Sequence, residues 1–216
     1  MKFYNSLGPN PRLVRMFMLE KGITLDTVEI DIMKAENRQK PYTDKNPAGE
    51  MPCLELDDGS YLAETIAICE YLEEKHPKPV LIGATAEERA KTRMWIRRIE
   101  YQINNPMTDG FRYAEGKAMF EGRRHLIPQA ADDLKAIARE GLAWLDAQIA
   151  GRPFICGQSL TLADILLFAF VEFGSGVGQP LDPKLGHLKQ WLDRMASRPS
   201  AEASLHPIAK AGGMKA

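Results

Sequence analysis

The first 32 residues alternate between strand-like and helix-like patterns, and this alternation limits the possible folds more than any other feature. Lys2–Asn5 is a short β-like run that Gly8 and the prolines after it interrupt. From Arg12 onward apolar residues recur at helical spacing, and Gly22 supplies a stop. Thr27–Ile32 then alternates apolar and polar residues as a second strand. A strand, a helix and a strand in this order predict two parallel strands with a right-handed crossover.

A hairpin and a helix are predicted next. Lys34–Asn46 is polar and poorly periodic, which indicates a loop or a loose helix. Pro52–Leu62 has the pattern of two strands around Asp58-Gly59, a dipeptide that suits a type I′ turn. Glu64–Lys75 carries an apolar stripe at helical spacing. About 75 residues therefore form an α/β unit, β-α-β followed by β-β-α.

The remainder of the chain is predicted to be helical. Two prolines within His76–Pro79 are typical of a linker, and no convincing strand follows them. Thr85–Glu88 and Thr161–Asp164 have the spacing of capping boxes, at which helices begin. Residues 122–150 and 185–195 are further helical segments, and the tail after Pro199 has the composition of a frayed end. The predicted organisation is an α/β domain at 1–77, a linker at 78–85 and an all-helical domain at 86–216.

Composition excludes several classes of protein. Lys and Arg number 28 and Asp and Glu 29, so the formal net charge of −1 argues against nucleic acid as a partner. No apolar run reaches the length of a bilayer-spanning helix, and the N-terminus lacks the apolar region of a secretory signal. Three cysteines without C-x-x-C spacing predict neither a disulfide framework nor a zinc site. We expect a cytoplasmic protein without a metal or a membrane partner.

Two motifs resemble those of the cytosolic glutathione S-transferase family. Asn46–Leu54, Asp58-Gly59 and Glu64–Leu72 follow N-P-x-G-x-[VIM]-P-x-L, D-G and [ED]-[ST]-x-A-I-x-x-Y-L in order and spacing. Phe154–Asp164 resembles the capping motif of the family's second domain. The resemblance covers nearly the whole chain and is strongest to theta-like and Nu-like bacterial members. It implies a thioredoxin-like N-terminal domain, an all-α C-terminal domain, a homodimer and glutathione as co-substrate.

The resemblance also assigns glutathione-binding residues. Met51 and Pro52 are joined by a cis peptide in this family, which would let the Met51 main chain pair with the cysteinyl unit. Thr65, at a helix start, would take the γ-glutamyl carboxylate, and Glu64 would pair with its ammonium group.

The glycyl carboxylate of glutathione needs a donor from the polar stretch. Asn37 is the best positional match, with Lys40 and Lys45 as alternatives. Glu50 stands where many relatives carry Gln, Lys or Arg, and an acid beside a carboxylate would be repulsive.

Glutathione chemistry depends on a thiolate, because a free thiol has a pKa of about 8.5. The family places Tyr, Ser or Cys in the loop after the first strand, but here the usual Ser position falls on Gly8 and the loop has no cysteine. Asn10 resembles the Pro-Asn of Nu-like members, in which the amide and N–H groups face the sulfur. Asn10 is the predicted sulfur-side donor and Ser6 the second candidate, while a helix N-cap is the structural alternative for Asn10.

Met107 and Phe111, after a break at Asn104–Pro106, are candidates for the second-substrate pocket, with ordinary packing as the alternative. The predicted function is a glutathione transferase, which activates the thiolate for attack on an electrophilic small molecule. The alternatives are a glutathione-dependent disulfide or peroxide reductase and a non-catalytic binding or interaction module. Members that isomerise maleylacetoacetate carry a Ser-rich loop after the first strand, and this chain lacks it.

Overall fold

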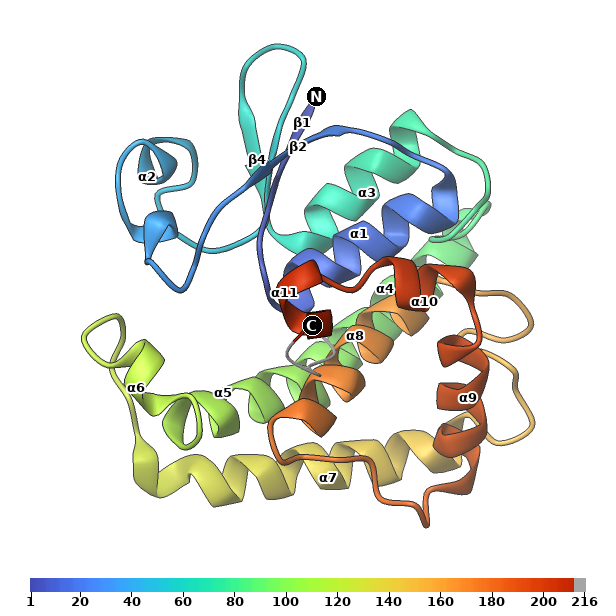
Figure 1. Cartoon of the computed structure of the whole chain (residues 1–216). Coiled ribbons are helices and arrows are strands. Elements are labelled where there is room, and N and C mark those ends of the chain that lie inside the picture. Colours follow the sequence, from blue (N-terminus) through green and yellow to red (C-terminus); the bar gives the residue numbers. More distant parts are fainter. Residues whose placement is uncertain (212–216) are drawn as a thin grey trace. The chain divides into compact units, whose positions relative to one another are not determined.

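The structure is a computed structural model that describes residues 1–211, and the chain divides into two compact units (Figure 1). The first unit holds Met1–Ile82 together with the segment from Arg198 onward, and the second holds Gly83–Ser197. The C-terminal segment thus groups with the α/β unit rather than with the helices that precede it. The domain limits at 77 and 86 stay a prediction.

The first unit is built on a four-stranded sheet of order β2-β1-β3-β4. β1 (Lys2–Asn5) pairs in parallel with β2 (Asp26–Glu29) and antiparallel with β3 (Cys53–Glu55), which pairs antiparallel with β4 (Tyr61–Ala63). α1 (Pro9–Lys21) connects the parallel strands, which confirms the predicted strand-helix-strand unit. β2 is shorter than expected: it ends at Glu29, after which Ile30 N–H makes one more main-chain hydrogen bond to β1, to Asn5 O at 2.9 Å.

The hairpin between β3 and β4 is confirmed, but the predicted type I′ turn is wrong. That turn needs positive φ at both central residues, whereas only Gly59 has it, at 81°. Gly59 N–H donates to Leu56 O at 3.1 Å and Leu56 N–H to Ser60 O at 2.8 Å. The loop is therefore longer than two residues, and Asp58 keeps an ordinary backbone while its carboxylate accepts from Ser60 N–H at 2.9 Å.

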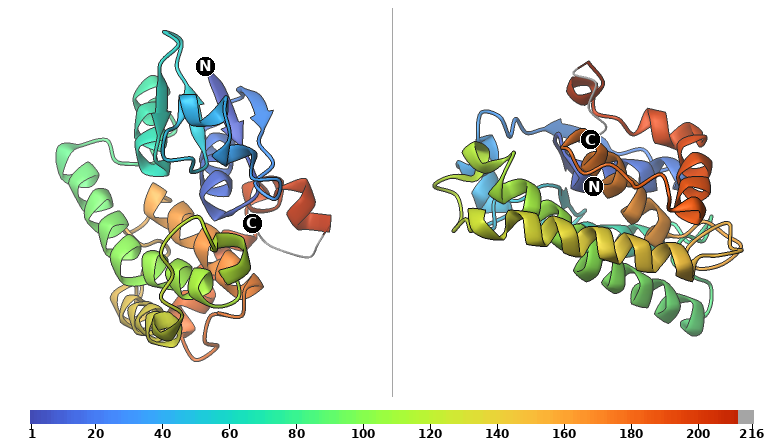
Figure 2. Two further views of the ribbon diagram at one scale, coloured as in Figure 1. Left: turned by 90° about the vertical axis from the view of Figure 1, so that its left-hand side faces the viewer. Right: turned by 90° about the horizontal axis from the view of Figure 1, so that it is seen from below.

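Helices cover the two sides of the sheet differently. α1 and α3 (Thr65–Lys75) lie on one side (Figures 1 and 2), where alternate strand residues such as Phe3 and Leu54 are fully buried. The short helices η1 (Glu36–Arg38) and α2 (Tyr42–Lys45) lie on the other side (Figure 1). The loop or loose helix predicted over Lys34–Asn46 is therefore confirmed.

The predicted frayed tail is wrong for residues 199–211, which form α10 (Pro199–Ala203) and α11 (Pro207–Ala211). Buried Arg12 donates to Ala201 O at 3.1 Å, and Arg15 Nε donates to Ser204 O at 2.8 Å. Small residues at this end allow the backbone to approach α1 closely, so guanidinium groups can reach its carbonyls. Residues 212–216 of the tail lie outside the described part of the chain.

The second unit is helical, as predicted. Its elements are α4 (Ala86–Ile99), the π-helical turn η2 (Glu100–Asn104), α5 (Asn105–Tyr113), α6 (Lys117–Phe120), η3 (Pro128–Ala130), α7 (Ala131–Gln148), α8 (Leu162–Gly176) and α9 (Gly186–Ala196). The expected break near Asn104 is a π turn that runs directly into α5, because Pro106 fits in the first turn of the new helix. The helix predicted from Gly122 begins only at Ala131, since Gly122 has φ 75°.

Both predicted capping boxes are confirmed. Thr85 and Glu88 exchange side-chain and backbone hydrogen bonds at the start of α4. At the start of α8, the buried Asp164 carboxylate accepts from the N–H groups of Thr161 at 2.9 Å and Ile155 at 2.8 Å. α8 runs through the middle of this unit (Figure 1) and is apolar on nearly every face. No helix within residues 1–211 is both long and apolar enough to cross a bilayer.

Candidate functional site

Three loops of the first unit leave the sheet at the same end. Tyr4 of β1 lies opposite Cys53 of β3, and Cys53 lies opposite Ala63 of β4. β1 and β4 end beside this row, whereas antiparallel β3 begins there. The β1–α1 loop, Met51-Pro52 and Glu64-Thr65 are therefore neighbours. These are the segments to which sequence reasoning assigned the cysteinyl and γ-glutamyl ends of the ligand.

The Met51-Pro52 segment presents main-chain groups without protein partners. The peptide between the two residues is cis, as predicted. Neither the N–H nor the carbonyl of Met51 makes a hydrogen bond within residues 1–211. The preceding carbonyl, of Glu50, is held by the Tyr42 hydroxyl at 2.7 Å and by Asn46 Nδ2 at 2.8 Å. Met51 can therefore pair with an extended ligand as an added strand would.

Glu64 and Thr65 lie at the start of α3. Glu64 has φ 68°, a conformation that costs a non-glycine residue roughly 1–3 kcal/mol and often marks a functional site. Its carbonyl accepts from Ile68 N–H at 2.9 Å, so the N–H groups of residues 64–67 have no partner inside the helix. Glu64 is exposed and Thr65 half-buried. These N–H groups and the Thr65 hydroxyl can receive a carboxylate.

Asn10 occupies the second position of α1. The N-cap is Gly8, with φ 130°, so the alternative interpretation of Asn10 as the N-cap is wrong. Pro9 and Pro11 carry no N–H, which makes Asn10 N–H the donor inside the first turn. Asn10 is half-buried and has no hydrogen bond to another residue in the described part of the chain. Its side-chain amide and its N–H are both open to a ligand.

Ser6, the second candidate, is already engaged. Its side chain is buried, and its hydroxyl donates to Ile30 O at 2.6 Å. Its carbonyl accepts from Arg15 Nη1 at 3.0 Å, and the same nitrogen donates to Asn5 Oδ1 at 2.7 Å. Burial lowers the pKa of Arg15 to about 10. Ser6 therefore ties the start of the loop to Ile30, directly after β2, whereas the polar groups of Asn10 are available to a ligand.

Asn37 and Gly49 hold the polar stretch together. Asn37 is buried, and its Nδ2 donates to Gly49 O at 2.6 Å, while its Oδ1 is buried without a partner among the described residues. Gly49 has φ 63°, and a Cβ there would lie 2.9 Å from Asn37 O. The N-P-x-G motif thus needs glycine for this close approach. One amide hydrogen of Asn37 is already used by the fold.

Arg38 is a residue that sequence reasoning missed. Its Nη2 lies 2.7 Å from Glu50 Oε1, and its Nη1 donates to Ala48 O at 3.0 Å. The acid expected to repel the glycyl carboxylate is therefore paired with a cation. No pattern in the sequence links positions 38 and 50, because the intervening stretch lacks a regular period.

Met107 and Phe111 both lie on α5 in the second unit. Met107 is fully buried, and its sulfur would lie 2.8 Å from a Cβ placed at Gly174. The half-buried ring of Phe111 makes T-shaped, edge-to-face contacts with those of Phe120 and Phe173, with centroids 6.3 and 5.2 Å apart. Both residues contribute to the packing of this unit, and a role in substrate binding stays a prediction.

A pocket of about 210 Å³ links the β1–α1 loop to the C-terminal segment. Ser6 and Leu7 line it on one side, and His206 and Ile208 line it on the other. His206 Nε2 lies 3.1 Å from Glu29 Oε2, which holds this wall against β2. The sequence does not predict this pocket, because the tail that supplies His206 and Ile208 has no helical period.

Family models match both parts of the chain. Residues 8–75 match the family described as "Glutathione S-transferase, N-terminal domain". Residues 119–199 match the one described as "Glutathione S-transferase, C-terminal domain". Together the two matches include β2, β3 and β4, the Met51-Pro52 cis peptide and the part of the helical unit from the end of α6 to α9.

Individual relatives agree. Glutathione S-transferase 2 of Saccharomyces cerevisiae is 30% identical over 200 residues, which are 92% of this chain and 86% of that protein. The solved structure of Gtt2 from Saccharomyces cerevisiae superposes with a TM-score of 0.89 at 30% identity, over 95% of this chain and all of the other. A maleylacetoacetate isomerase of Pseudomonas aeruginosa is 35% identical over 196 residues, 90% of this chain and 89% of that protein. This chain belongs to the glutathione S-transferase family.

Proposed function

We propose that this protein is a glutathione transferase that joins the sulfur of glutathione to an electrophilic carbon. One observation carries the proposal: at the same end of one sheet, Asn10, Met51 and Thr65 offer polar groups that have no partner among residues 1–211. A tripeptide with a central thiol needs such a row of main-chain and helix-start donors. The names of the relatives favour the same activity.

The two ends of glutathione would be held by different chemistry. Met51 N–H and C=O pair with the cysteinyl unit, and the start of α3 with Thr65 receives the γ-glutamyl carboxylate. Exposed Glu64 pairs with the ammonium group. At the other end, Arg38 supplies positive charge for the glycyl carboxylate while it is also paired with Glu50. Asn37, with one amide hydrogen bonded to Gly49, orders this end.

The sulfur would lie at the start of α1. Asn10 offers an amide and an N–H there, and hydrogen bonds to a thiolate lower the pKa of its thiol. The Ser6 hydroxyl proton is directed at Ile30 O, which favours Asn10 over Ser6. The thiolate lone pair then forms the C–S bond, the leaving group departs with the electrons of its bond to that carbon, and the thiol proton goes to solvent.

Calorimetric titration of glutathione between pH 5 and 9 tests the proposal. We expect binding with a bound-thiol pKa well below about 8.5, and a higher value in Asn10→Ala but not in Ser6→Ala. No binding at millimolar glutathione would overturn the enzyme and leave a non-catalytic module. If Asn10→Ala binds glutathione with an unchanged thiol pKa, Asn10 is not the donor to the sulfur.

Isomerisation is the second candidate, because a relative 35% identical to this chain is a maleylacetoacetate isomerase. Gly8–Pro11 contains no serine, unlike the Ser-rich loop expected for that activity. Assays with maleylacetoacetate and with 1-chloro-2,4-dinitrobenzene separate the two activities. A disulfide substrate tests the reductase alternative, which the names of the relatives do not favour.

The state and location of the protein are part of the same proposal. We expect a cytoplasmic homodimer, as the family resemblance implies. Light scattering coupled to gel filtration measures the mass in solution, which for a dimer is twice the 24.2 kDa of one chain.

A further inference from the structure

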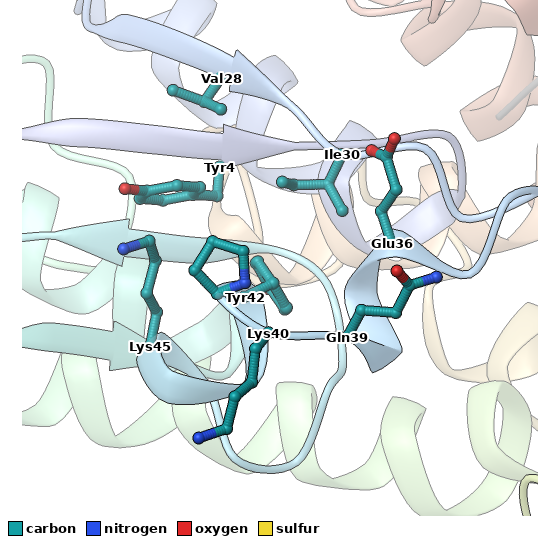
Figure 3. A pocket seen from close by; sticks show the side chains of 9 residues that line it. Tyr4, Val28, Ile30, Glu36, Gln39, Lys40, Tyr42 and Lys45 are labelled. Atoms are coloured by element: carbon teal, nitrogen blue, oxygen red, sulfur yellow. The ribbon is translucent and has the colours of Figure 1, made fainter.

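A second pocket lies against the face of the sheet to which Tyr4 and Val28 belong (Figure 3). It has a volume of about 460 Å³, within the range of small-molecule sites. Tyr4 and Val28 line it from the sheet, Ile30 from the residue that follows β2, and Tyr42 from α2. Its remaining lining residues are Glu36, Gln39, Lys40, Pro41 and Lys45. None of the residues that the proposed function assigns to glutathione lines this pocket. Lys40 and Lys45, the alternative donors to the glycyl carboxylate, both line it.

Lys45 is the unusual group in this pocket. Its side chain is half-buried, and Nζ lies 5.7 Å from the ring centroid of Tyr4 and 5.1 Å from that of Tyr61. It also lies 3.2 Å from the Tyr61 hydroxyl. Within residues 1–211 no carboxylate lies at ion-pair distance from this ammonium group. Aromatic faces attract a cation but do not neutralise it.

Other polar groups of the pocket already have partners. Lys40 pairs with Asp44 at 3.5 Å, and its amine points away from the pocket (Figure 3). The Glu36 carboxylate accepts from Asp31 N–H at 2.8 Å. The Tyr4 hydroxyl donates to Glu55 at 2.7 Å, so it offers no proton to a ligand. Glu55, which accepts from the Tyr4 hydroxyl, attracts Lys45 electrostatically but makes no ion pair with it. Lys45 is thus a cation beside an apolar, aromatic wall that has no ion pair within the described part of the chain.

We propose that this pocket binds an aromatic carboxylate, with the ring against Tyr4, Val28 and Ile30 and the carboxylate on Lys45. An ion without an apolar body would leave the wall of the sheet exposed to water. A neutral apolar molecule would leave the half-buried Lys45 without an ion pair. The site is distinct from the glutathione site, and its occupation does not depend on the proposed transferase activity.

The test uses the full chain and two probes of one shape, 2-naphthoate and 2-naphthalenemethanol, in calorimetric titrations. We expect naphthoate to bind about tenfold more tightly than the alcohol, the ratio that one charge-assisted hydrogen bond supplies. Lys45→Met should remove that difference, whereas the matched variant Lys40→Met should keep it. Saturating glutathione should leave the affinity for naphthoate unchanged.

Three outcomes would overturn the proposal: no naphthoate binding to the wild type, equal affinities in Lys45→Met and Lys40→Met, or displacement of naphthoate by glutathione. A second variant, Val28→Phe, fills the pocket from the sheet and should abolish binding of both probes. If Val28→Phe fails to fold, the comparison of Lys45→Met with Lys40→Met still tests the proposal. A protein that binds naphthoate but not glutathione would refute only the proposed function.

Discussion

Arg38 Nη2, at the end of η1, lies 2.7 Å from Glu50 Oε1, beyond the short helix α2. Glu50 directly precedes Met51, so a ligand that pairs with the Met51 main chain lies beside a carboxylate whose charge Arg38 already balances. Both side chains are partly exposed, and an isolated pair of this kind contributes little to stability. We expect the ion pair to affect the affinity for glutathione instead.

We expect Arg38→Ala to raise the KM for glutathione roughly three- to tenfold with a smaller change in kcat, because Glu50 is then left unpaired beside the glycyl carboxylate. Adding Glu50→Gln to Arg38→Ala should recover part of the loss. Steady-state kinetics on both single variants and the double variant measure the coupling. Additive effects would mean that the two side chains act independently on the ligand.

Ser6→Ala should lower the free energy of unfolding by roughly 1–2 kcal/mol, because the Ile30 carbonyl loses its hydroxyl donor at a buried position. Urea denaturation measures this change. Turnover per folded molecule should stay near the wild-type value, since the hydroxyl is not directed at the sulfur. A large fall in kcat without a loss of stability would instead return Ser6 to the catalytic site.

Gly141→Ala should destabilise the second unit by about 2 kcal/mol or more. A Cβ at Gly141 would clash with the carbonyl oxygen of Gln102 in the π turn and would lie 2.9 Å from Ile103 Cγ1. Gly176→Ala is the matched control, because its Cβ would have no neighbour within 4 Å. That variant should be neutral or slightly stabilising. Similar unfolding midpoints in urea for both variants would contradict the close approach of α7 to η2.

Glu20→Gln should weaken the attachment of the C-terminal segment at neutral pH. Glu20 accepts two hydrogen bonds from Arg198 at 2.7 Å and one from Ser200. Burial alone would raise the pKa of Glu20, but these bonds lower it below the ordinary value of 4.5. The unfolded chain then binds a proton more readily, so this contribution is complete above pH 4.5 and is lost as the pH falls through the folded-state pKa.

Urea denaturation of the wild type and Glu20→Gln at pH 7 and pH 3 measures that effect. We expect a difference of roughly 1–3 kcal/mol at pH 7 that shrinks at pH 3. Asp193→Asn, which breaks an exposed pair with Lys189 on α9, is the control and should change stability by less than about 0.5 kcal/mol. A difference that grows on acidification would refute the assigned role of Glu20.

Much of the fold could be predicted from local patterns. The strand-helix-strand unit, the hairpin and the helices that begin at Thr85 and Thr161 depend on side chains close in sequence, so their signals are intact there. The Gly122 boundary could not be predicted, because the sequence does not reveal that this glycine takes a φ of 75°. The π turn could not be predicted either, because Gln102 and Ile103 pack closely against Gly141 of α7. The helices of the tail depend on Arg12 and Arg15, which lie nearly 190 residues earlier.

The candidate site divides in the same way. The cis peptide at Met51 and the helix start at Thr65 follow from short motifs that demand those residue types. Sequence alone could not separate Asn10 from Ser6, because only the third dimension brings the Ile30 carbonyl to the Ser6 hydroxyl. The ion pair of Arg38 with Glu50 could not be predicted for the same reason.

The first unit contains both the start of the chain and the segment that begins at Arg198, and this affects the order in which it is made on the ribosome. The 115 residues of Gly83–Ser197 are translated between the two parts of that unit, which at ordinary elongation rates takes roughly 6 to 23 s. During that interval Ala201 and Ser204, whose carbonyls receive Arg12 and Arg15, do not yet exist. The unit that begins translation first is therefore completed last, after every residue of the helical unit has been added to the chain.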